Sequence, residues 1–133
     1  MATARLPAFF ERHVLLVGGA LAALGAHPTC NLLYRCGCAP FFAGGVTHCN
    51  IHQPSPPHCP WCSGGALAFA AVAAAIVATM AGALVLARRR YGRRLPTSAA
   101  AVVLGFALGA LLAGLAAALI AGYPTVLGIP LRP

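Results

Sequence analysis

Acidic residues and lysine are almost absent from this chain of 133 residues: Glu11 is the one carboxylate side chain, and there is no lysine. A single carboxylate cannot supply the paired acids of general acid–base catalysis, and no Ser-His-Asp set can form at the cysteine-rich segment. Calcium and magnesium sites are excluded there as well, because both ions bind clusters of oxygen ligands. The chain also lacks the CxxCH motif that attaches c-type haem.

Charge of either sign is missing from residues 64–87 and 99–122. Each stretch has 24 residues, which as a helix would reach roughly 36 Å and cross a hydrocarbon core of about 30 Å. Both are therefore predicted to be transmembrane helices. Neither contains an ionisable residue, which argues against a proton relay or an ion pathway within them.

A shorter apolar segment lies near the N-terminus, at residues 14–26, and follows Arg5 and Arg12. This pattern fits the hydrophobic region of a cleaved signal peptide. It also fits a first transmembrane helix over residues 9–33, because Leu32, Leu33 and Tyr34 lengthen the apolar run. We favour the transmembrane helix because the match to a cleavage site is loose.

The arginines are concentrated between the two long spans, at Arg88, Arg89, Arg90, Arg93 and Arg94. Arginine in a short loop between membrane helices marks the cytoplasmic side. No aromatic or recognition element accompanies these arginines, so nucleic acid is not expected as a partner. The pattern predicts a multi-pass protein of a bacterial-type inner (plasma) membrane, with the arginine loop inside and the cysteine-rich loop outside.

The predicted fold class is an all-α membrane protein of two or three transmembrane helices, with an irregular loop rich in cysteine and histidine. Small residues recur at every fourth position in the last span, beginning with Gly105 and Gly109. Such a stripe lets helices approach closely, so the expected partners are lipid, a membrane protein or a second copy of the chain. The predicted segments are 1–27 (N-terminal hydrophobic segment), 28–63 (outer loop), 64–87 (span), 88–98 (arginine loop), 99–122 (span) and 123–133 (outer tail).

All six cysteines and three of the five histidines lie between Cys30 and Cys62. The motif H-C-x-x-H at residues 48–52 is followed by H-C-x-x-C at residues 58–62. Two-residue spacing of thiolates and imidazoles is typical of half of a tetrahedral zinc site. We therefore predict a first metal site at Cys49, His52, Cys59 and Cys62. A possible second set is Cys36, Cys38, His48 and His58, and Cys30 is a further candidate ligand outside both sets. Soft sulfur and nitrogen ligands favour zinc or copper.

Two other uses of the cysteines stay open. The pairs Cys59–Cys62 and Cys36–Cys38 have the spacing of redox-active dithiols, which would make the protein a membrane thiol–disulfide oxidoreductase. Six cysteines in an oxidising compartment also permit three structural disulfides without metal. The histidines beside the cysteines favour metal, since disulfides do not require them. The leading hypothesis is a small, non-enzymatic metal-binding protein that acts as an accessory or structural subunit of a membrane complex.

Overall fold

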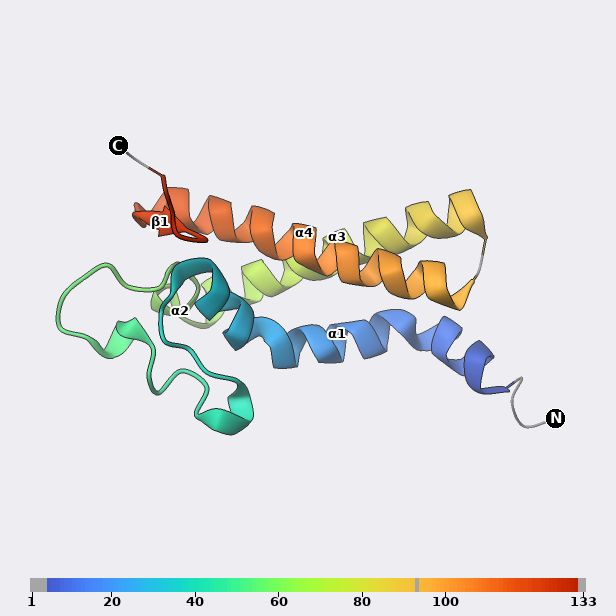
Figure 1. The fold of residues 1–133 in the computed structure, drawn as a ribbon, viewed down its shortest axis with the longest axis horizontal. Helices are drawn as coiled ribbons and strands as arrows, with labels where there is room; N and C mark the ends of the chain where they lie inside the picture. The colour runs from blue at the N-terminus through green and yellow to red at the C-terminus, as the bar shows by residue number, and fades with distance from the viewer. Residues whose placement is uncertain (1–4, 93, 132–133) are drawn as a thin grey trace.

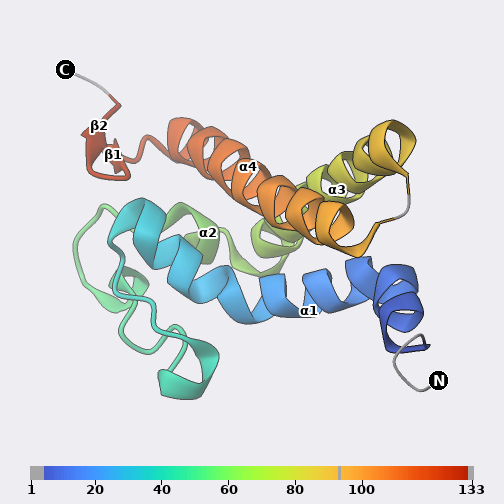
Figure 2. The ribbon, with the colours of Figure 1, turned by 45° about the vertical axis from the view of Figure 1, so that its right-hand side comes forward.

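Three long helices dominate the computed structural model, which describes residues 5–92 and 94–131. They are α1 (Arg5–Tyr34), α3 (Gly65–Tyr91) and α4 (Leu95–Ala121). Each contains a stretch that is long and apolar enough, by length and composition, to cross a membrane, which agrees with both predicted spans and with a helical N-terminal segment. In Figures 1 and 2 the irregular loop and the β1–β2 hairpin lie at one end of the three helices, and the start of α1, the end of α3 and the start of α4 lie at the other.

The loop was predicted to start at residue 28, but its first seven residues, 28–34, belong to helix α1. Pro28 lies inside this helix, although proline cannot donate the backbone hydrogen bond that a helix normally makes at that position. The helix ends where Arg35 takes a positive φ of 52°. Cys30 is therefore a helical residue rather than a loop residue, and helix α1 fixes its position.

Helices α3 and α4 pack closely along the predicted stripe of small residues (Figure 1). A Cβ atom at Gly105 would lie 2.7 Å from the Cα atom of Met80 and 2.9 Å from the carbonyl oxygen of Thr79. A Cβ atom at Gly109 would lie 3.0 Å from the Cα atom of Ile76. The absence of side chains at the two glycines thus brings the backbones of two helices of the same chain together.

The arginine segment is shorter than the predicted loop. Helix α3 continues to Tyr91 and α4 begins at Leu95, so Arg88, Arg89 and Arg90 form the last turn of a helix. Basic side chains at a helix C-terminus interact favourably with the helix dipole. Arg93 lies outside the described residues.

At the other end, the loop contains three short helices, η2 (Phe41–Ala43), η3 (Asn50–His52) and α2 (Pro60–Ser63). The predicted tail forms a small hairpin of β1 (Thr125–Val126) and β2 (Ile129–Pro130). Between these strands, the Leu127 N–H donates a 2.7 Å hydrogen bond to the carbonyl oxygen of Leu33. The C-terminal segment is therefore attached to the end of α1, beside the cysteines.

Candidate metal centre

The six cysteines come together at this end of the molecule from three parts of the chain. The first part contains Cys30, in α1, and Cys36 and Cys38, just beyond that helix. The second contains Cys49, which precedes η3. The third contains Cys59, just before α2, and Cys62, within α2. Five of the side chains are at most 2% exposed, and Cys62 is half-buried. All six are free thiols in the structure.

The turn after α1 depends on Gly37, which has a positive φ of 83°. A side chain there would collide with the carbonyl oxygen of His48. The Gly37 N–H donates a 2.8 Å hydrogen bond to Oδ1 of Asn31, and the carbonyl of Cys36 accepts one of 2.8 Å from the Asn50 N–H. Glycine thus allows the chain to turn between two cysteines and to pack against the Cys49 segment.

Asn50 connects the separate parts of the loop. Its Oδ1 accepts a 2.7 Å hydrogen bond from the Cys59 N–H, and its Nδ2 donates to the carbonyl of Pro57 at 2.9 Å and to the hydroxyl of Tyr123 at 3.3 Å. One amide side chain therefore holds the Cys49 segment, the Cys59 segment and the end of α4 together.

Cys59 and Cys62 lie on one short turn of helix. Cys59 is the N-cap of α2, and Pro60 takes the first helical position, where its missing N–H costs nothing. Trp61 is buried and makes an edge-on contact with Tyr34, with the ring centroids 5.9 Å apart. The turn is thereby packed against the end of α1, and both thiols belong to the same cluster.

Tyr34 and Tyr123 form the base of this packing. The Tyr34 hydroxyl donates a 2.8 Å hydrogen bond to the carbonyl of Gly114 in α4. The Tyr123 hydroxyl donates one of 2.9 Å to the carbonyl of Tyr34. These bonds are buried, so they attach the end of α1 to the end of α4 in a fixed geometry.

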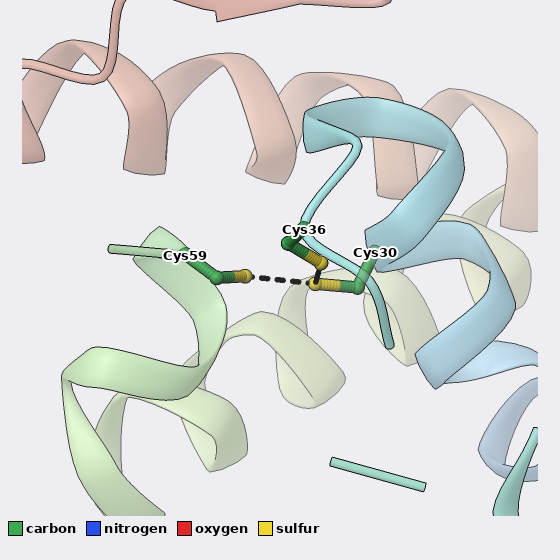
Figure 3. Close-up of side chains that lie close together, drawn as sticks. All are labelled: Cys30, Cys36 and Cys59. Atoms are coloured by element: carbon green, nitrogen blue, oxygen red, sulfur yellow. Dashed lines mark hydrogen bonds between the residues drawn. The ribbon is translucent and has the colours of Figure 1, made fainter. Parts of the chain in front are cut away.

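The sulfur atoms lie in mutual contact. The Sγ atom of Cys30 lies 2.9 Å from that of Cys59 and 3.3 Å from that of Cys36, as Figure 3 shows. The Sγ atom of Cys38 lies 3.4 Å from that of Cys36 and 3.9 Å from that of Cys62. Contacts of this kind link residues from the separate segments into one cluster.

Four groups of three cysteines have their sulfur atoms within 4.8 Å of one another and can hold a metal ion. The groups are Cys30, Cys36 and Cys59; Cys30, Cys38 and Cys62; Cys36, Cys38 and Cys49; and Cys49, Cys59 and Cys62. Among the described residues, none of these groups includes a histidine. We refer to the six residues together as the cysteine cluster.

The predicted ligand sets come together in part. Three members of the first set, Cys49, Cys59 and Cys62, form one of the four groups. Of the histidines, Nε2 of His52 lies 3.1 Å from the carbonyl oxygen of Val46. Nδ1 of His58 lies 3.0 Å from the carbonyl oxygen of Asn50, while His48 is exposed. Cys36 and Cys38 of the second set share a group with Cys49 instead.

The thiols differ in acidity. Burial raises the pKa of Cys38 and that of Cys49. A hydrogen bond from Cys30 lowers the pKa of Cys59 and that of Cys62, because it stabilises the thiolate. Negative charge in the cluster therefore concentrates on the two cysteines of the Cys59-Pro60-Trp61-Cys62 turn.

Two important residues were not assigned roles from the sequence. Cys30 was recognised as a candidate ligand but placed in neither set. The sequence feature that could have indicated its role is its position at the end of an apolar segment, six residues before Cys36. No sequence pattern indicates the role of Asn50, because only the fold brings its three hydrogen-bond partners close to it.

Comparison with known proteins identifies no relative: no family model, no curated protein and no solved structure is significantly similar to this chain.

Proposed function

We propose that this protein is an integral membrane protein that binds a thiol-seeking metal, zinc or copper, in the cysteine cluster. The observation that carries the proposal is the convergence of six free thiols, five of them buried, from three parts of the chain. A thiol gains little from burial beside other thiols, whereas a bound metal replaces the thiol protons and satisfies several thiolates together. Soft sulfur ligands select zinc or Cu(I) over calcium and magnesium.

In the proposed arrangement the cysteine cluster lies on the outer face of a bacterial-type inner membrane, and the arginine segment lies in the cytoplasm. The distribution of arginine supports this orientation. The protein serves as an accessory or structural subunit of a membrane complex. Apolar side chains exposed along the helices, such as Leu104, Leu112 and Ile120, support contact with lipid or with a partner helix.

A second candidate function is that of a thiol–disulfide oxidoreductase. It is favoured by Cys62, the one half-buried cysteine, whose pKa is lowered by the hydrogen bond from Cys30. Accessible thiolates of low pKa are typical of redox-active cysteines. Cys59 lies three positions away and belongs to the same group, so it would be the resolving partner.

Metal analysis and a count of free thiols, on protein purified in detergent without chelator, distinguish these functions. A metal site contains zinc or copper in a simple ratio to the chain, and its thiols react with a thiol reagent only after the metal is removed. A redox pair contains no metal, and replacing the resolving cysteine, Cys59→Ser, traps a mixed disulfide on Cys62. Protein without metal and without free thiols would contradict both functions and indicate three structural disulfides.

A further inference from the structure

The four metal-holding groups overlap in a regular way. Each of the six cysteines belongs to two groups, and any two groups share a single cysteine. Three pairs never occur together in a group, and these are Cys30 with Cys49, Cys36 with Cys62, and Cys38 with Cys59. This is the connectivity of an octahedron whose corners are the six sulfur atoms, with the three pairs at opposite corners. The four groups are one set of alternate faces, and the other four faces meet the same 4.8 Å limit; ions on one alternate set share corners and no edges.

A metal ion at each of the four faces would be bound by three sulfur atoms, and each sulfur atom would bridge two ions. Zinc fits this arrangement poorly, because structural zinc takes four ligands. The nearby histidines do not supply a fourth ligand in the structure, since His52 and His58 lie within hydrogen-bond distance of backbone carbonyls. Cu(I) is a soft ion that prefers thiolates and is satisfied by three of them.

The charge of the site also favours a monovalent ion. Six thiolates without metal, five of them buried, would carry six negative charges in a site of low dielectric constant, which is strongly unfavourable. Four Cu(I) ions reduce this to two negative charges. Four divalent ions on the same faces would give two positive charges and leave each ion without a fourth ligand, and the single acidic residue of the chain, Glu11, lies far along the sequence from the loop.

We infer that the cysteine cluster binds four Cu(I) ions as a single thiolate cluster in which all six cysteines bridge; this inference rests on the proposed metal-binding function. Loading is balanced without a redox step, because six thiols and four Cu(I) ions yield the cluster and six protons. With metal–sulfur bonds of about 2.3 Å, three sulfurs around one ion lie about 4 Å apart. The shortest sulfur contacts therefore lengthen on binding by about 1 Å, while Cys38 and Cys62, 3.9 Å apart, already have this separation.

The test is an anaerobic titration of the reduced, metal-free, full-length protein in detergent with Cu(I), in the presence of a Cu(I) chelator of known affinity. We expect one cooperative transition that ends at four Cu(I) per chain, with release of the protons that the thiols carry before loading. X-ray absorption at the copper edge should show sulfur neighbours alone, three per copper, and a copper–copper distance. An end point of one or two copper ions, or nitrogen in the copper shell, would overturn the cluster.

Other outcomes separate this inference from the proposed function. Tight binding of one or two zinc ions, with weaker binding of Cu(I), would overturn the four-copper cluster and leave metal binding intact. Iron together with acid-labile sulfide indicates an iron–sulfur cluster, so finding both would also overturn the four-copper cluster and leave metal binding intact. Failure to bind any of these metals would contradict both proposals.

Variants provide a second readout. Cys38→Ser removes a sulfur atom that two groups share, so the end point should fall below four and cooperativity should be lost. His52→Ala is the matched control, since it removes a candidate ligand and leaves all six sulfurs in place. It should retain four copper ions, whereas a site of three cysteines and His52 predicts a loss. Circular dichroism and gel filtration of each variant establish that it is folded, and a folded Cys38→Ser protein that still binds four copper ions would refute the bridging role.

Discussion

The Sγ atoms of Cys30 and Cys59 lie 2.9 Å apart, although 29 positions separate the two residues in the chain. Cys30 is part of a membrane-length helix, and Cys59 begins the short helix that leads into the next one. A metal shared by the two would therefore link the ends of α1 and α3. Such a link gives the loop a role in holding the helices together as well as in binding metal.

Asn50→Ala should weaken both the fold and metal binding. The variant loses hydrogen bonds to the Cys59 N–H, the carbonyl of Pro57 and the hydroxyl of Tyr123, and it leaves partly buried groups without partners. We expect the free energy of unfolding to fall by about 1–3 kcal/mol, measured by denaturant titration in detergent, with weaker metal retention against a chelator. Asn31→Ala, which loses one exposed bond to Gly37, is the control and should have a smaller effect. Equal effects would contradict the central role of Asn50.

Gly105→Ala should destabilise the helix pair within the chain. The new methyl group would lie 2.7 Å from the backbone of Met80, so α3 and α4 must separate. We expect a loss of about 1–3 kcal/mol, measured by unfolding in mixed micelles of increasing SDS content. Gly82→Ala in α3 is the matched control, because its Cβ would have nothing within 4 Å. The two variants should differ clearly, and similar unfolding curves would show that close packing at Gly105 is unimportant.

Cys62 should react first with iodoacetamide in the reduced, metal-free protein. It is the half-buried cysteine, and its lowered pKa means that it is already a thiolate at pH 6, where an ordinary thiol is protonated. Cys38 is buried and its pKa is raised, so it should react later than Cys62 and only as the pH increases. Peptide mass spectrometry after short exposures at pH 6 and pH 8 measures the order. Uniform labelling of all six cysteines at pH 6 would contradict the expected acidities.

Reporter fusions should place the two ends of α3 on opposite sides of the membrane. A fusion after Arg94 is expected to report the cytoplasm, and a fusion after Cys62 the outer side, because the arginines remain inside. Replacing Arg88, Arg89 and Arg90 by Gln should reduce this preference. Two fusions reporting the same side would mean that α3 does not cross the membrane.

The membrane helices could be predicted because their signal lies in composition. Uncharged stretches of membrane length leave few alternatives to a spanning helix, since every backbone group must be paired within it. The boundaries were harder to predict: the outer loop was expected to start at residue 28, whereas α1 continues to Tyr34, close to the end at residue 33 of the favoured transmembrane helix. The packing of Tyr34 against Trp61, Tyr123 and Gly114 stabilises this last turn, and none of those contacts is local in the sequence.

The sequence shows which segment contains the cysteine cluster, but the arrangement of the sulfur atoms could not be predicted from it. Two-residue spacing suggested that Cys59 and Cys62 lie close together, and the structure places both in one group because one turn of helix brings them near each other. The neighbours of Cys36 and Cys38 depend on the turn at Gly37 and on the hydrogen bond from the Asn50 N–H to Cys36. An irregular loop has no periodicity from which such contacts follow.

The hydrogen bond between Asn50 and Tyr123 has a consequence for the order of biosynthesis. Tyr123 follows α4, so this bond cannot form until the chain has been synthesised beyond that helix. The same is true of the bond from Leu127 to Leu33. The six thiols therefore emerge before Tyr123 and Leu127, and a loop that is to bind metal would have to stay reduced until the C-terminal hairpin closes over the end of α1.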